Sequence, residues 1–447
     1  MKRESNKYHT AETTGFKAIF RSLRYRNYRL FFCGQSISLI GTWMQRIAMP
    51  WLVYTLTGSP FLLGVVGFAG QIPTFLIAPF AGVLIDRWNR YIILIITQIL
   101  AMVQSFVLAF LFFNHSIEVW HIILLSIFLG CINAFDMPAR QSFVVDMIEK
   151  REDLGNAIAL NSSMVNSARL LGPSIAGVLI SLTGEGICFL LNGVSYIFVI
   201  VFLLMMRISP RKVKTHNTHV LQGLKEGFTY TFWFMPIRYI ILLLALVSLM
   251  GMPYTVLMPV FAKSILHGGS HTFGFLMGAS GIGALVGAIY MASRKSVVGL
   301  GKIVPLAAAF FGIGLIAFSL SNIFLLSMAL MLVIGFGMIM QMTSSNTILQ
   351  TIVDDDKRGR VMSFYTMAFM GTAPFGSLLA GVLASSIGAP NTLIIGGVSC
   401  ILGAVVFARK LPEIKKMIHP IYIRLGIIPE VTSGVQTATE LTTPPEE

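Results

Sequence analysis

Nine residues between two apolar runs decide the fold of this chain: Gly82-Val83-Leu84-Ile85-Asp86-Arg87-Trp88-Asn89-Arg90. The flanking runs, 60–85 and 91–113, are each long enough to cross a hydrocarbon core as a helix, which needs about 20 apolar residues. The acid and the two bases between them belong at a polar surface rather than among lipid tails. The stretch therefore predicts a tight turn at a membrane surface that joins two membrane-spanning helices.

The rest of the chain repeats this pattern of long apolar runs and short polar breaks. Mean hydropathy is +0.77 and 12% of the residues are charged, against about 25% in an ordinary soluble domain. Strands of a membrane barrel would alternate over about ten residues, whereas these runs are continuously apolar. The predicted fold class is an all-α membrane protein with twelve transmembrane helices, at 28–57, 60–85, 91–113, 119–139, 156–182, 187–207, 237–261, 272–292, 303–321, 324–346, 361–386 and 391–411.

The basic residues indicate which way the chain crosses the membrane. If the N-terminus is cytoplasmic, all 33 lysines and arginines except Arg46, Arg169 and Lys263 fall in or beside cytoplasmic segments. Such a bias predicts that both termini lie on the cytoplasmic side of the membrane. It also attributes the formal charge of +14 to attraction for anionic lipid, so no nucleic-acid partner is expected.

The chain also divides into two halves of six helices. Ser174-Ile175-Ala176-Gly177-Val178-Leu179 recurs half a chain later as Leu378-Leu379-Ala380-Gly381-Val382-Leu383. A repeat that preserves topology is typical of two bundles related by pseudo-two-fold symmetry. The expected parts are a cytoplasmic N-terminal segment 1–27, an N-terminal bundle 28–207, a cytoplasmic linker 208–236, a C-terminal bundle 237–411 and a cytoplasmic tail 412–447.

The quoted stretch resembles the signature loop of the major facilitator superfamily, which runs Gly, three residues, Asp-Arg, two residues, Arg. The resemblance implies a conformational latch in which the acid lies against a helix N-terminus, where a carboxylate is stabilised by about 0.3–1 kcal/mol. The equivalent stretch of the second half has Met291 where the acid would align, so a one-sided latch is expected. A generic positively charged loop is the alternative. The residues assigned to the latch are Gly82, Asp86, Arg87 and Arg90.

A second motif, formed by Arg169, Gly172, Pro173 and Gly177, looks like the Gly-Pro signature of exporters within that superfamily. An ordinary tight helix crossing is the alternative, because small residues let two helices approach closely.

A third stretch, Asp136–Phe143, together with Arg26–Phe31 and Gly41–Gln45, is similar to the branch that holds the enterobactin exporter and the macrolide efflux proteins. The resemblance implies a secondary carrier that exports a siderophore or a hydrophobic drug by alternating access. We expect the carrier to be a monomer.

Polar side chains inside a span are candidates for the transport path, because exposing them to lipid is costly. Arg46 lies well within the first span, and its planar fork suits a substrate with anionic or carbonyl oxygens. The alternative is that Arg46 and Arg169 make structural bonds to carbonyls or to Asp136. Helical spacing and the family's cavity-lining helices together predict a cavity lined by Gln35, Ser38, Thr42, Arg46, Gln71, Asn166, Gln341 and Ser345.

Asp136 is the acid that comes nearest to the membrane interior, so it is the candidate coupling site. The alternative is a surface partner for Arg140. The histidines and cysteines do not cluster, so no metal ligand, cofactor or catalytic residue is predicted, and a membrane-embedded enzyme is a remote alternative. The expected partners are a small-molecule substrate, the lipid bilayer and protons. A facilitator-type lysophospholipid flippase and an uptake carrier remain open as alternatives.

Overall fold

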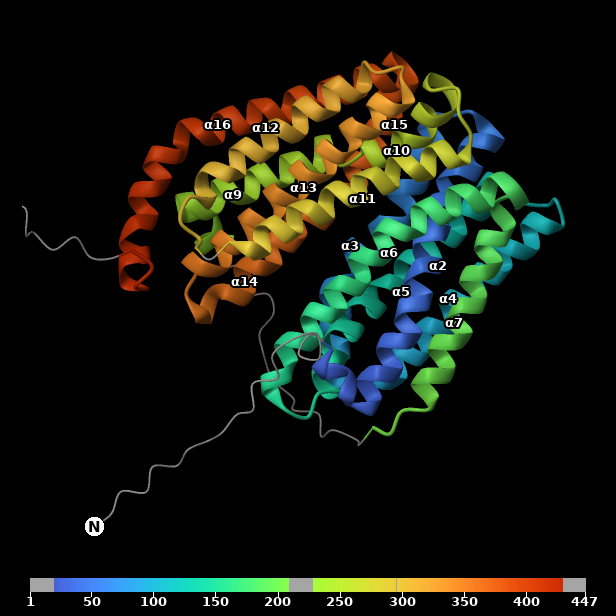
Figure 1. The fold of residues 1–447 in the computed structure, drawn as a ribbon, viewed down its shortest axis with the longest axis horizontal. Helices are drawn as coiled ribbons and strands as arrows, with labels where there is room; N and C mark the ends of the chain where they lie inside the picture. Colours follow the sequence, from blue (N-terminus) through green and yellow to red (C-terminus); the bar gives the residue numbers. More distant parts are fainter. Residues whose placement is uncertain (1–19, 209–227, 295, 429–447) are drawn as a thin grey trace, which may run out of the picture. The chain divides into compact units, whose positions relative to one another are not determined.

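A computed structural model describes residues 20–208, 228–294 and 296–428, and every regular element within these ranges is helical (Figure 1). The remaining parts of the expected N-terminal segment, linker and tail lie outside the described residues. The first half of the chain contains η1 (Arg21–Arg24), α2 (Arg26–Thr57), α3 (Pro60–Arg87), α4 (Arg90–Phe113), α5 (Val119–Asp146), η2 (Arg151–Asp153), α6 (Leu154–Thr183) and α7 (Glu185–Leu204).

The second half contains two membrane segments that are interrupted rather than continuous. The expected helix 237–261 is broken by a π-helical turn, and so is the expected helix 361–386. The last helix, expected to end at 411, continues for three further turns. The elements are α9 (Met235–Leu246), η3 (Val247–Gly251), α10 (Tyr254–Val260), η4 (Phe261–Ile265), α11 (Ser270–Ser293), α12 (Leu300–Ser319), α13 (Phe324–Ile352), α14 (Asp355–Thr366), η5 (Met367–Gly371), α15 (Ala373–Ile387) and α16 (Ala389–Arg424).

Eleven of the membrane segments are long and apolar enough to span a bilayer by length and hydropathy alone. The twelfth is α2, which has 32 residues but carries Gln35, Gln45 and Arg46 among its apolar side chains. It packs against α6 and α7 within the same bundle. The predicted all-helical fold with twelve membrane helices is confirmed.

The turns between helices are set by local backbone chemistry. Gly58 ends α2 in the left-handed region with φ of 62°, a conformation that glycine adopts at little cost. Ser59 then caps α3 by accepting a hydrogen bond from the backbone N–H of Leu62. Asn89 caps α4 by accepting from the backbone N–H of Tyr91. The quoted stretch therefore contains a helix end, a two-residue break and a capped helix start.

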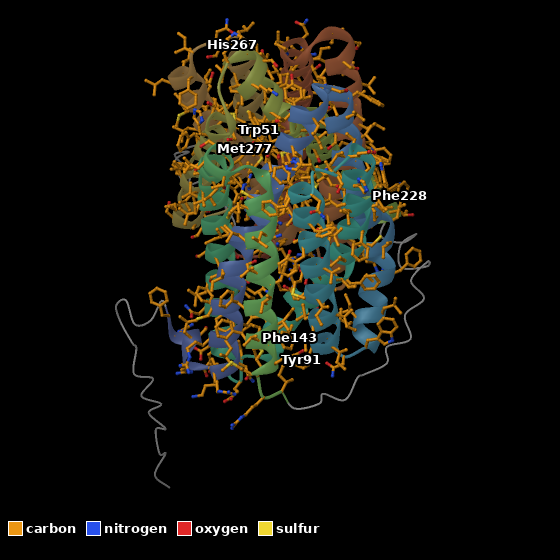
Figure 2. The ribbon with its side chains drawn as sticks, turned by 90° about the vertical axis from the view of Figure 1, so that its right-hand side faces the viewer. Trp51, Tyr91, Phe143, Phe228, His267 and Met277 are labelled. Atoms are coloured by element: carbon orange, nitrogen blue, oxygen red, sulfur yellow. The ribbon has the colours of Figure 1, made fainter. Side chains whose placement is uncertain are left out.

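Contacts divide the chain into two compact units, the first made of residues 1–216 and 258–281 and the second of residues 217–257 and 282–447. In the first unit α2 packs against α6 and α7, while α5 packs against α3 and α4. One end of this unit has an aromatic core in which the rings of Tyr91 and Phe143 lie 6.2 Å apart (Figure 2). In the second unit α12 packs against α13 and α16.

The π-helical turns of the second unit contact each other. The Ser248 hydroxyl of η3 donates a hydrogen bond of 2.5 Å to the carbonyl of Phe369 in η5. A π turn shifts the usual pairing of backbone groups, and here a side chain from the opposite π turn satisfies one of the carbonyls. Gly376 on α15 lies so close to the carbonyl of Leu249 that a side chain there would clash. The two interrupted helices are therefore held together at their irregular turns.

Candidate functional site

Two arginines of the first unit share one indole ring. The guanidinium of Arg46 lies 4.9 Å from the ring centroid of Trp43, and that of Arg169 lies 5.9 Å from it. A cation over an indole face is attracted by the ring quadrupole. Trp43 belongs to the same helix as Arg46, so α2 itself supplies an aromatic contact for this charge. The arrangement leaves two positive charges beside each other within membrane-spanning helices.

Gly172 accounts for the position of Trp43 against α6. A side chain at Gly172 would place its Cβ less than 3.0 Å from the Cβ of Trp43, a separation that real Cβ atoms do not show. Further along α6, a Cβ at Gly177 would lie 2.9 Å from the Cα of Gly274 on α11. Pro173 is inside α6 without ending it. This motif is thus a close-packing surface on two neighbours, and it brings Arg169 to the ring that Arg46 covers.

The exposure of Arg46 separates it from the other polar residues of α2. Its side chain is exposed, and it forms no hydrogen bond or ion pair with any residue that the structure describes. Gln35 and Ser38 are both 2% exposed. The Thr42 hydroxyl donates to the carbonyl of Ser38 and lies 3.4 Å from the hydroxyl of Tyr196. Of this predicted set on α2, Arg46 is therefore the member available to a ligand.

The other predicted cavity residues are bonded within their own helices. Asn166 donates to the carbonyl of Ser162 and Gln71 to that of Gly67. Gln341 is buried and donates to the hydroxyl of Ser345 at 3.4 Å. The structure does not bring Gln341 and Ser345 to an open surface, so their assignment stays a prediction.

Asp136 lies in a buried polar cluster formed by three helices. Its Oδ1 accepts hydrogen bonds from Gln98 at 2.7 Å and from Thr97 at 3.1 Å, both on α4. Its Oδ2 lies 3.4 Å from Arg140 on α5. The other terminal nitrogen of Arg140 donates to the side-chain carbonyl of Gln35 on α2 at 3.1 Å. A buried carboxylate needs this degree of pairing, because an isolated charge would be strongly disfavoured there.

A second buried network was not found from the sequence. Gln45 donates to Gln104 at 2.9 Å and accepts from Ser105 at 2.8 Å and from Asn192 at 2.7 Å. The network ties α2 to α4 and α7 through neutral groups. The sequence does indicate that such a network exists, because isolated glutamines occur inside apolar runs and an amide in the membrane needs a hydrogen-bond partner. Which amides meet depends on helix packing, and spacing along one helix does not reveal it.

The predicted latch is only partly described. Arg90 lies 3.4 Å from Asp146 and joins the start of α4 to the end of α5. A side chain at Gly82 would meet open space. The side chains of Asp86 and Arg87 lie outside what the structure describes, so their latch role stays a prediction.

The segment before α2 is clasped to the start of α6 by Asp153. This buried carboxylate pairs with Arg21 at 3.1 Å, accepts from the Tyr25 hydroxyl at 2.6 Å and pairs with Arg24. Burial alone would raise the pKa of Asp153, but the Tyr25 hydrogen bond and the two arginines outweigh it and lower this pKa below its ordinary value. Asn27 adds a bond to the carbonyl of Arg207, beyond the end of α7. We call this group of contacts the N-terminal clasp.

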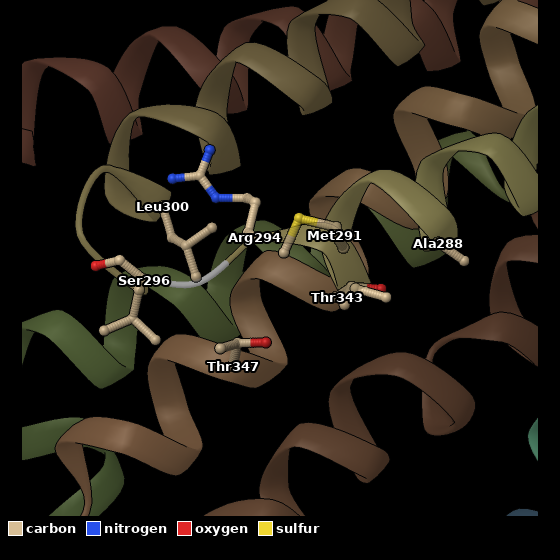
Figure 3. A pocket seen from close by; sticks show the side chains of 9 residues that line it. Ala288, Met291, Arg294, Ser296, Leu300, Thr343 and Thr347 are labelled. Atoms are coloured by element: carbon tan, nitrogen blue, oxygen red, sulfur yellow. The ribbon is translucent and has the colours of Figure 1, made fainter. Parts of the chain in front are cut away.

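The second unit has a cavity of about 300 Å³ at the stretch that corresponds to the latch loop (Figure 3). Met291 and Arg294 line it from the end of α11, and Thr343 and Thr347 line it from α13. Met291 occupies the aligned position of Asp86, so an apolar side chain lines this cavity where the first half has an acid.

These features define a class of protein. Membrane helices in two units, with charged side chains held inside the spans, are typical of a transporter. Among the residues that the structure describes, no group of three or more His, Cys, Asp or Glu side chains could hold a metal ion.

The sequence family described as transmembrane secretion effector matches residues 17–422. The chain belongs to this family of major facilitator transporters, and it is a transporter rather than an enzyme. It is 27% identical to the staphyloferrin A transporter of Staphylococcus aureus, over 85% of this chain and 95% of that one. It is 22% identical to macrolide efflux protein A of Streptococcus pyogenes, over 88% and 99%. The fold resembles that of a bacterial homologue of the human lysosomal transporter Spinster, with a TM-score of 0.68, 13% identity and coverage of 88% and 98%.

Proposed function

We propose that this transporter exports an amphipathic small molecule with anionic or oxygen-rich groups, of the siderophore or drug class. The observation that carries the proposal is the pair of arginines, Arg46 and Arg169, on the ring of Trp43. Planar guanidinium groups bind carboxylate and carbonyl oxygens in pairs. The indole between them adds an apolar surface of the kind that an amphipathic molecule needs.

The surroundings of Arg46 support this role. Its side chain is exposed, and it lies within the membrane-spanning helix α2. A charge facing lipid would cost about 2.5–3.5 kcal/mol on insertion scales, which favours a position of Arg46 toward water. The names of the relatives, a staphyloferrin A transporter and a macrolide efflux protein, favour export of such compounds.

We propose protons as the coupling ion and Asp136 as the site that binds them. This carboxylate is buried within a membrane-spanning helix, and Arg140 connects it to Gln35 on α2. A movement of α2 relative to α5 would change the distance of Arg140 from the carboxylate. Proton binding and helix movement are linked if one state holds the ion pair and the other releases it.

The remaining assignments follow the family pattern. We propose a monomer in the bacterial inner membrane with both termini in the cytoplasm, since the basic residues lie on one side of the predicted topology. Asp86, with Gly82, Arg87 and Arg90, would act as a latch that biases the two conformations of an alternating-access cycle.

The test uses purified protein in liposomes with an imposed pH gradient and radiolabelled staphyloferrin A or a macrolide as probe. We expect accumulation that requires the gradient. Asp136→Asn should abolish gradient-driven accumulation while retaining exchange of substrate across the membrane, and Glu149→Gln serves as a control at an exposed acid. Unchanged gradient-driven transport by Asp136→Asn would assign coupling to another group. Movement of lysophospholipid in place of both probes would establish the flippase alternative.

A further inference from the structure

The last helix of the chain is longer than a membrane span requires. Its 36 residues extend for about 54 Å at 1.5 Å per residue, whereas the hydrocarbon core is about 30 Å thick. Pro412 and Pro420 lie within it, and proline bends a helix by removing a backbone hydrogen bond. Figure 1 shows the red end of α16 turning and running across the end of the second unit. We call residues 409–424 the α16 extension.

One face of the α16 extension is fixed to its own bundle. Ile414, Ile418 and Tyr422 recur at every fourth position and are buried. At the far end, Arg424 lies 3.0 Å from Asp354, which precedes α14. Near the start, the side chain of Leu411 lies against Gly301 of α12. The extension is therefore a docked helix with a defined outer face.

The outer face is basic, and among the described residues of the extension Glu413 is the acid beside it. Arg409, Lys415, Lys416 and His419 are exposed. The acid within the extension, Glu413, forms an ion pair with Lys410 at 2.9 Å. Arg409, Lys415 and Lys416 form no ion pair or hydrogen bond with the residues that the structure describes. Three lysine or arginine side chains are thus exposed on a helical extension that continues directly from a membrane span.

We propose that the outer face of the α16 extension binds anionic phospholipid headgroups of the adjacent leaflet. A helix continuous with a membrane span emerges at headgroup depth, where anionic lipids attract clustered lysine and arginine residues. The outer face also exposes the apolar side chain of Met417 beside the charges, which suits the boundary between headgroups and acyl chains. The proposal depends on the proposed topology only for the name of the leaflet, which is the cytoplasmic one.

The test measures lipid preference directly, so its result is independent of substrate and coupling. The full-length protein is reconstituted with spin-labelled phosphatidylglycerol or spin-labelled phosphatidylcholine, and the motionally restricted fraction gives the relative association of the two lipids. We expect the wild type to prefer phosphatidylglycerol, less so at high salt because salt screens surface charge. Each lysine near an anionic surface contributes about 1 kcal/mol, about fivefold, so the Lys415→Gln/Lys416→Gln variant should reduce this preference by up to about thirtyfold.

Two variants keep the test decisive. Lys415→Arg/Lys416→Arg retains the charge and should retain the preference. Arg26→Gln/Arg29→Gln removes the same charge from exposed positions of α2 and should have a smaller effect. The proposal is overturned if the lipid preference survives Lys415→Gln/Lys416→Gln, or if both glutamine variants reduce it equally. A loss of transport with an unchanged lipid preference would point to a protein partner and would also overturn it.

Discussion

Arg46 and Arg169 come from two helices, and both guanidinium groups lie over the ring of Trp43. Aromatic contacts of this kind stabilise a cation by about 0.5–1 kcal/mol at exposed sites and by more where water is excluded. They leave the N–H donors of Arg46 available, because a ring face occupies none of them. A site built in this way keeps its positive charge ready for an anionic group.

The first prediction concerns Arg46. Arg46→Lys preserves the charge but loses the planar fork, so transport of an anionic substrate should fall about tenfold, equivalent to about 1.4 kcal/mol. Arg46→Ala should fall further. Initial rates in proteoliposomes at matched protein content measure the effect, and Arg29→Lys at an exposed position of the same helix is the control. If both Arg46 variants transport every exported compound at the wild-type rate, Arg46 does not contact the substrate and has a structural role.

Some of the candidate site residues can be recognised from the sequence, and others cannot. Arg46, Arg169 and Asp136 stand out because an ionised group in an apolar run is rare and costly. Gln341 and Ser345 share a helix face, but the structure shows that they satisfy each other. Gln45 meets Asn192 from another helix, and that pairing depends on tertiary contact. A charged residue in an apolar run can be recognised from the sequence, whereas the hydrogen-bond partner of a neutral amide is known only from the packed structure.

Among the helices, α6 packs most closely on its neighbour where a glycine faces that neighbour. Gly172 faces Trp43 with no space for a side chain, whereas Gly155 on the same helix has no neighbour within 4 Å of its would-be Cβ. The exporter-like motif of the sequence is therefore a packing device whatever its part in export.

The second prediction uses this pair of glycines. Gly172→Ala should destabilise the protein by about 1–3 kcal/mol, the usual cost of overpacking. Gly155→Ala should be neutral or slightly stabilising, because alanine favours a helix over glycine by about 1 kcal/mol. Thermal unfolding in detergent, followed by a thiol-reactive dye or by light scattering, compares the two. Equal melting temperatures would contradict the packing role of Gly172.

The third prediction concerns the N-terminal clasp. A carboxyl group whose pKa is lowered on folding stabilises the folded state above its ordinary pKa, and this contribution is lost as pH falls through the lowered value. The clasp should therefore be intact at neutral pH and open only in acid. Asp153→Asn should lower the melting temperature at pH 7, and this difference should disappear on acidification. Glu152→Gln is the matched control, because Arg21 uses the backbone carbonyl of Glu152. A pH-independent loss of stability would show that charge is not involved.

The starts of the first-half helices follow well from hydropathy, because every span needs about 20 apolar residues. The π turns η3 and η5 do not follow from it. In the sequence, Ser248 and Phe369 look like ordinary residues of apolar runs. The hydrogen bond between them joins two helices that are far apart in sequence. A π turn persists when its freed backbone groups find partners elsewhere, and those partners exist only after the helices have packed.

On the scale of the whole molecule, a transporter depends on the balance between its conformations. The fourth prediction is that Asp86→Asn slows transport while substrate affinity stays nearly unchanged, since a latch biases conformations and does not touch the substrate. Transport rates and equilibrium binding of the same compound, measured on the same preparation, separate the two effects. Glu149→Gln, which removes an exposed acid, is the control. A simple loss of binding by Asp86→Asn would argue against the latch.

The packing of α2 has a consequence for how the protein is made. A ribosome delivers α2 to the translocon before its main neighbours α6 and α7, which are synthesised about one hundred residues later, several seconds at 5–20 residues per second. Because α2 carries Arg46 and is not among the eleven segments that are apolar enough to span a bilayer by length and hydropathy, it gains little alone from entering lipid. We expect α2 to stay at the translocon until α7 arrives, and crosslinking of stalled nascent chains that end before and after α7 would reveal whether it leaves earlier. A helix that is synthesised before its neighbours would then reach its final position only after them.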